Sequence, residues 1–158
     1  MNQKVKISEQ KTQLLNSLGY IAIPINQNIA GQLLINAKIN DVDGVYILDT
    51  GASTTVIDTS QIKTLQLKLN NDEAELTGGG LGAHGIENIP SYDNKIEISN
   101  FKIDSFLVAV MSLETAWASL ASIGANDILY GIIGVDILKI GNAIIDYGTM
   151  TLYLIQPE

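Results

Sequence analysis

The stretch Val45-Tyr46-Ile47-Leu48-Asp49-Thr50-Gly51 joins an apolar run directly to an aspartate, a small hydroxyl residue and a glycine. The β-branched and aromatic side chains predict a buried strand, and the glycine permits a tight turn after it. An acid at the end of such a strand is exposed on the turn. After the four residues 52–55 comes another apolar pair, Val56-Ile57. Asp49 is therefore the first candidate for a reactive group.

The rest of the sequence offers few other reactive groups. It has no cysteine and one histidine, His84, which leaves too few nitrogen and sulfur ligands for a zinc site. A serine triad would have to use His84, and no Gly-x-Ser-x-Gly turn is present to expose a nucleophilic serine. We interpret His84 as a loop residue without a catalytic role. We therefore expect no metal and no cofactor, and carboxylates remain the abundant reactive groups.

Two other patterns have simpler explanations. Asp41, Asp43 and Gly44 are similar to a fragment of a calcium loop, but the later ligands of that motif are missing. Residues 40–44 are instead expected to form a hairpin turn, with Asp43-Gly44 as its signal. The glycines at 80, 82 and 85 have dinucleotide-binding spacing, yet the residues 86–90 that follow cannot begin the helix that would hold a pyrophosphate.

The composition restricts the class of protein. A chain of 158 residues fits one folded domain, and we expect residues 1–18 to be a polar N-terminal arm before a single domain, 19–158. The net charge of −8, without a basic cluster, argues against a nucleic-acid partner. No stretch approaches the roughly 20 apolar residues that cross a bilayer, and the first residues are no secretory signal. We expect a soluble domain, cytoplasmic or, if a leader was removed, periplasmic.

The hydrophobic pattern predicts a mainly β chain with two or three short helices. Strands are expected at 19–25, 31–39, 45–48, 75–77, 86–89, 95–99, 101–110, 129–134, 143–147 and 150–155. A short helix is expected to start near Asp58, with others at 113–123 and 135–140. So many short strands with glycine turns favour a closed barrel over a parallel sheet.

A second segment of the sequence helps to interpret Asp49-Thr50-Gly51. Gly131-Ile132-Ile133-Gly134 precedes the expected short helix and two closing strands. With this order of elements, the sequence from about Asn36 to Leu154 resembles the retropepsin-like aspartic proteases, of the retroviral and bacterial single-domain type. The resemblance implies an acid-protease β-barrel that acts on peptide or protein chains.

The resemblance also implies a role for each matching residue. Asp49 would be the catalytic acid, Thr50 would hydrogen-bond across a dimer axis, and Gly51 would shape the active-site turn that Ala52 completes. The support behind that turn would be Ile132, Ile133 and Gly134. The flap over the substrate would be Gly78, Gly79, Gly80, Leu81 and Gly82. Asp136 and Asp146 would be structural, with Asp136 capping the short helix.

Only one such tripeptide is present, since neither Asp104 nor Asp146 is followed by the required residues. The two carboxylates of an aspartic protease would therefore come from two copies around a two-fold axis. The leading hypothesis is a homodimeric aspartic endopeptidase that activates water between two Asp49 carboxylates. One alternative is a catalytically silent module of the same fold that binds an extended peptide. Another is a purely structural domain.

Overall fold

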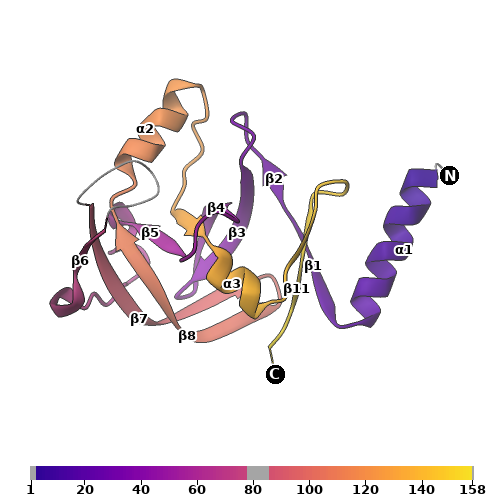
Figure 1. Cartoon of the computed structure of the whole chain (residues 1–158), viewed down its shortest axis with the longest axis horizontal. Helices are drawn as coiled ribbons and strands as arrows, with labels where there is room; N and C mark the ends of the chain where they lie inside the picture. Colours follow the sequence, from indigo (N-terminus) through magenta and orange to yellow (C-terminus); the bar gives the residue numbers. More distant parts are fainter. Residues whose placement is uncertain (1–2, 78–85, 158) are drawn as a thin grey trace.

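The computed structural model describes residues 3–77 and 86–157, which form a mainly β protein with helices at its periphery (Figure 1). The α-helices are α1 (Gln3–Ser17), α2 (Glu114–Ser122) and α3 (Val135–Ile140). The strands are β1 (Tyr20–Pro24), β2 (Asn26–Gln27), β3 (Leu33–Ile39), β4 (Val42–Leu48), β5 (Val56–Asp58), β6 (Glu75–Thr77), β7 (Ile86–Ile98), β8 (Phe101–Met111), β9 (Gly131–Ile133), β10 (Ile144–Asp146) and β11 (Thr151–Ile155).

Six strands close into a barrel in the order β3-β4-β9-β5-β8-β7. β7 returns to β3 through the pairs Lys38↔Glu97 and Ile39↔Ile96. The interior holds apolar side chains from all around the barrel, among them Ile35, Ile39, Ile57, Ile96, Val108, Val110 and Ile133. The mainly β fold and closed barrel predicted from the sequence are confirmed, because alternating apolar residues along each strand all face this one core.

The hairpin between β3 and β4 turns earlier than the sequence suggested. The strands are paired up to Ile39↔Val42, so the two turn residues are Asn40 and Asp41. Both have positive φ, 51° and 66°, as the two-residue turns that match strand twist require. The turn predicted at 40–44 is therefore present at its first two residues, but Asp43-Gly44 is not part of it, because asparagine and aspartate also tolerate positive φ. Gly44 lies inside β4, where a Cβ would come within 2.6 Å of the Tyr130 ring.

Two of the expected short helices form at the predicted positions, as α2 and α3. The segment after Asp58 forms a single 3-10 turn, Thr59–Gln61, in which the Asp58 carboxylate accepts a hydrogen bond from the Ser60 N–H at 3.3 Å. A longer helix does not form there because the turns that follow end at Gln66, which has a positive φ of 53°.

A second, three-stranded sheet of order β1-β11-β10 joins the two ends of the chain. Helix α1 lies along this sheet, on the side away from the barrel (Figure 1). Tyr153 of β11 is fully buried, and its hydroxyl lies 2.7 Å from Thr12 Oγ1 of α1. Lys11 of α1 forms an ion pair with Asp146 of β10. The region predicted as a polar arm, 1–18, thus contains a helix.

Helix α1 ends because Gly19 adopts a positive φ of 90°, a common way for a helix to terminate. None of the helices in the described residues is long and apolar enough to cross a membrane.

Candidate active site

Asp49 begins the turn that leaves the buried end of β4. Its N–H donates to the Ile133 carbonyl at 3.0 Å, which continues the parallel pairing of β4 with β9 by one residue. The carboxylate then folds back over its own turn, since Asp49 Oδ1 accepts from the Gly51 N–H at 2.7 Å. The Ala52 N–H donates to the Asp49 carbonyl at 3.3 Å. Three backbone N–H groups therefore fix the position and direction of this half-buried acid.

Gly51 leaves room for the Asp49 carboxylate. A Cβ at this position would lie 3.1 Å from Asp49 Oδ1, which is closer than ordinary van der Waals contact. Thr50, between the two, is exposed. Ala52 is half-buried, and its carbonyl accepts from the Val135 N–H at 2.8 Å. The structure thus places the predicted turn residues 49–52 together, next to the start of α3.

The predicted supporting residues lie directly behind this turn. Strand β9, with Ile132 and Ile133 buried, runs between β4 and β5. Gly134 follows it at a point of close backbone approach, where a Cβ would lie 2.8 Å from the carbonyl oxygens of Ala52 and Thr54. A side chain here would push the Asp49 turn outward. Sequence reasoning did not assign a role to Gly131, although a Cβ there would lie 2.1 Å from the Val56 carbonyl oxygen.

Thr55 and Asp136 form a clamp that the sequence did not reveal. The Asp136 carboxylate accepts from the Thr55 N–H and from the Thr55 hydroxyl, both at 2.7 Å. The Thr55 hydroxyl in turn accepts from the Gly134 N–H at 3.1 Å. Asp136 was predicted to cap α3. Gly134 holds the N-cap position without a side-chain bond, but the Asp136 carboxylate accepts from the Ile137 N–H in the first turn of α3 at 2.9 Å. Asp136 also ties the chain after the Asp49 turn to the start of the helix.

A cavity of about 330 Å³ opens beside Asp49. Its walls are mostly apolar, with Ile47 and Ile132 on the barrel side and Trp117 and Leu120 on α2. Asp49 is the one ionisable residue among the described residues that line it. The Trp117 indole N–H is buried and has no hydrogen-bond partner in the part of the chain that the structure describes. The helix predicted at 113–123 therefore forms a wall of the candidate active site.

The other aspartates near these elements are held in structural contacts. Asp58 Oδ1 accepts from the Leu113 N–H at 2.7 Å, which anchors the start of α2. In Asp146 the ion pair with Lys11, followed by hydrogen bonds from Thr149 and Gly148, lowers the carboxyl pKa to about 2. Among the described residues, no cluster of three acids, histidines or cysteines suited to a metal ion is found. One copy of the chain thus presents a single aspartate at the cavity.

The predicted flap residues Gly78, Gly79, Gly80, Leu81 and Gly82 lie outside the described residues. The strands expected on either side of this segment, at 75–77 and 86–89, are present and pair with each other from Glu75↔Asn88 to Thr77↔Ile86.

Comparisons with known proteins agree with this arrangement. Residues 35–137, well over half of the chain, match the family model described as "Aspartyl protease". The structure is similar to the retroviral protease-like domain of Ddi1 from Leishmania major, with 17% sequence identity, a TM-score of 0.53, and 78% of this chain and 87% of that chain covered. It is also similar to a retropepsin-like aspartic protease from Rickettsia conorii, with 21% identity, a TM-score of 0.53, and 86% and 90% covered. The comparison with curated proteins gives no match.

Proposed function

Because this chain belongs to the aspartyl protease family and has the retropepsin-like fold, we propose that it is an aspartic endopeptidase that works as a homodimer. The observation that carries the proposal is the position of Asp49. Its carboxylate is fixed by its own turn at an apolar cavity, where it is the one ionisable group in the described lining. Peptide or protein chains are the proposed substrates.

The proposed reaction needs two carboxyl groups with different protonation states. One Asp49 carboxylate takes a proton from a water molecule as the water oxygen bonds to the scissile carbonyl carbon. The other Asp49, which is protonated, donates its proton to the carbonyl oxygen. The tetrahedral intermediate then breaks its C–N bond. The amine leaves with the proton that the first Asp49 took from water, and a hydroxyl of the intermediate gives its proton to the other Asp49, which restores the dyad. Two like charges at close range keep one acid protonated while the other ionises.

The second carboxyl group is proposed to come from a second copy of the chain. Within the described residues, Asp58, Asp136 and Asp146 are held by the contacts described above, so none is free to pair with Asp49. A two-fold axis beside the exposed Thr50 would place the two active-site turns next to each other. The dyad would then have one Asp49 from each chain.

The direct experiment is to offer a diverse peptide pool to the native protein and to Asp49→Asn between about pH 4 and pH 7, the range expected for a tuned carboxyl dyad. The substitution keeps the shape of the side chain and its ability to accept from Gly51, so folding and association are expected to be unchanged. The proposal predicts cleavage by the native protein and none by the variant. Equal cleavage by both would contradict an aspartic mechanism. Absence of cleavage by a dimeric native protein would favour a silent peptide-binding module instead.

A further inference from the structure

Trp117 of α2 lines two hollows that differ in chemistry. The first is the mostly apolar cavity of about 330 Å³ beside Asp49 (the Asp49 cavity). The second, which we call the α2 hollow, has a volume of about 590 Å³. It is lined by Trp117, by two alanines of α2, and by side chains that carry oxygen, namely Asp58, Thr59, Ser60, Ser112 and Glu114. The indole therefore borders an apolar cavity and a hollow rich in hydrogen-bond acceptors.

The indole N–H has no partner in the position that the ring occupies. It is buried, and no acceptor for it is found in the part of the chain that the structure describes. A buried donor without a partner costs free energy, and nearly all buried donors in proteins have one. The ring packs against an apolar cluster that includes Ile47 and Ile132. Apolar contact thus holds the ring in place, while the unpaired N–H disfavours the same position.

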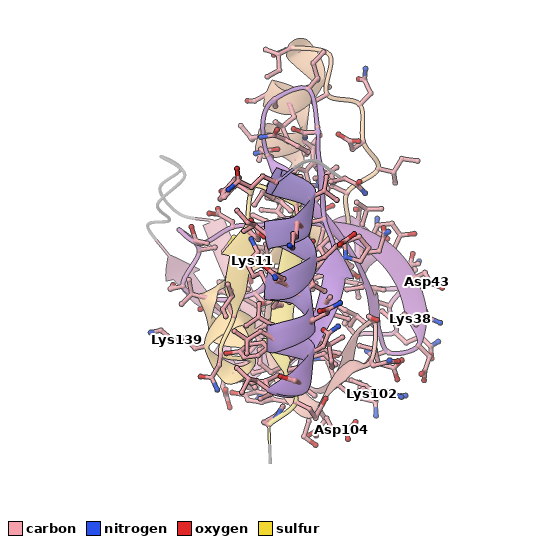
Figure 2. All side chains as sticks on the ribbon, turned by 90° about the vertical axis from the view of Figure 1, so that its right-hand side faces the viewer. Lys11, Lys38, Asp43, Lys102, Asp104 and Lys139 are labelled. Carbon is pink, nitrogen blue, oxygen red and sulfur yellow. The ribbon has the colours of Figure 1, made fainter. Side chains whose placement is uncertain are left out.

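Helix α2 leaves room for the ring to move. Figure 2 shows the orange helix α2 at one end of the molecule, with Lys102 and Asp104 at the opposite end, and α2 stands out from the barrel in Figure 1 as well. All residues of α2 are exposed or half-buried, whereas Leu113 before the helix and Ala125 after it are buried. The segment is therefore anchored at its two ends, and Trp117 between them is not enclosed.

Glu114 is the acceptor best placed to receive the indole N–H in the α2 hollow. It precedes Trp117 by three residues, and side chains at this spacing are neighbours on a helix. Its side chain is exposed and lines the hollow. The other carboxylate there, Asp58, already accepts from the Leu113 N–H at 2.7 Å and from the Ser60 N–H at 3.3 Å. A further donor is therefore best accommodated by Glu114.

We propose that Trp117 is a movable wall that adapts the Asp49 cavity to large apolar side chains of a substrate. An aromatic side chain that fills the cavity competes with the indole for contact with Ile47 and Ile132. The indole then turns to another rotamer in the α2 hollow, where Glu114 accepts from its N–H. A small side chain leaves the indole in place, so the ligand selects between two positions of one ring. The proposal rests on the proposed function, because a peptide bound at Asp49 is what fills the cavity.

Fluorescence tests the movement, because Trp117 is the one tryptophan of the chain. Two uncleavable peptides are titrated into the native protein. In both, a methyleneamine replaces the scissile amide, and they differ only in a phenylalanine or an alanine next to it. The phenylalanine peptide is expected to shift the tryptophan emission to longer wavelength, because the indole gains a charged hydrogen-bond partner, and the alanine peptide is expected to leave it unchanged. Binding of the phenylalanine peptide without a shift, or with a shift to shorter wavelength, would overturn the proposal.

Replacing Glu114 tests the partner of the indole. Glu114→Ala is expected to raise the dissociation constant of the phenylalanine peptide about tenfold, the effect of one lost hydrogen bond to a charged group, and to leave that of the alanine peptide unchanged. Glu114→Gln keeps an acceptor oxygen and is expected to retain most of the affinity for the phenylalanine peptide. Equal dissociation constants of that peptide for Glu114→Ala and the native protein would overturn the proposal.

Toluene tests the movement without a peptide, because it carries an aromatic ring but no group on which the proposed dyad could act. A shift to longer wavelength with toluene that is lost in Glu114→Ala would support the movable wall. If the same native protein cleaves no peptide, the protease activity is contradicted and the movable wall still stands. Cleavage of peptides without a shift by either the phenylalanine peptide or toluene would overturn the movable wall and leave the proposed function in place.

Discussion

At the scale of single residues, the position of Asp49 depends on hydrogen bonds made six residues further along the chain. Thr55 is fully buried, and its hydroxyl both donates to Asp136 and accepts from Gly134. Asp49-Thr50-Gly51 could be recognised from the sequence because its residues are consecutive. The clamp could not, because Thr55 and Asp136 are 81 positions apart and neither local pattern indicates the other.

Replacing Thr55 tests this clamp. Thr55→Val keeps the shape of the side chain but leaves the Gly134 N–H without its partner and removes one bond to Asp136. We expect it to lower the free energy of unfolding by about 1–3 kcal/mol, the cost of an unsatisfied buried polar group. Thr55→Ser, which keeps the hydroxyl, is expected to lower the free energy of unfolding by clearly less. Urea unfolding measures both, and a valine variant as stable as the serine variant would contradict the role of the clamp.

At the scale of elements, the helices show where the sequence pattern was informative. The bounds of α2 follow from its alanine-rich composition, but its position over the cavity depends on contacts of Trp117 and Leu120 with distant strands. α1 was not predicted as a helix, because the face it turns toward the sheet carries Ser8, Lys11 and Thr12 as well as Leu15. Polar residues at the buried positions remove the apolar periodicity by which such a helix is recognised.

Because Trp117 of α2 lines the cavity beside Asp49, we predict that replacing it changes the cleavage preference. Trp117→Ala enlarges the cavity beside Asp49, so larger apolar side chains are expected to fit next to the scissile bond. Two peptides are compared, one with a large aromatic residue next to the scissile bond and one with a small apolar residue at the same position. We expect the kcat/KM of the first divided by that of the second to rise at least about tenfold in the variant. The ratio does not depend on how much of the variant is folded. Ile123→Ala, at the exposed end of α2, is the control. An unchanged ratio in Trp117→Ala would show that this cavity does not bind the substrate.

Because the ion pair between Lys11 and Asp146 attaches α1 to β10, we predict that the stability of the fold depends on pH. The pKa of Asp146 is lowered to about 2, first by Lys11, below the unfolded value of about 3.9. A lowered folded-state pKa stabilises the fold above the unfolded pKa, and the stabilisation is lost as the pH falls from about 4 to about 2.

Lys11→Met removes the largest part of this contribution and keeps the hydrogen bonds from Thr149 and Gly148. It is expected to cost up to about 1 kcal/mol of unfolding free energy near pH 6, as for a surface ion pair, and progressively less toward pH 2. Lys6→Met removes the same charge from an exposed position of α1. Its unfolding free energy relative to the native protein is not expected to change in this way toward pH 2. Urea unfolding at several pH values measures the difference. A cost for Lys11→Met that stays constant with pH would contradict the proposed role of the pair.

At the scale of the whole molecule, one chain combines the six-stranded barrel, which carries a single Asp49 turn, with the three-stranded terminal sheet. The barrel was predictable because each strand alternates toward one core and the turns carry glycine, asparagine or aspartate. The pairing of β1 with β11 was not, because Tyr20 and Ile155 are brought together from opposite ends of the chain. That pairing leaves β10 at the edge of the terminal sheet, where Ile145 lines a hollow together with Thr50.

Mixing active and inactive chains tests the central claim most directly. Native protein and Asp49→Asn are combined in known proportions at constant total concentration, allowed to exchange subunits, and assayed on a cleaved peptide. If every active site needs one Asp49 from each chain, activity follows the square of the native fraction and falls to about a quarter in an equal mixture, since random pairing makes half of the dimers mixed. Activity that falls only in proportion to the native fraction, to about a half, would show that each chain works alone and would contradict the shared dyad.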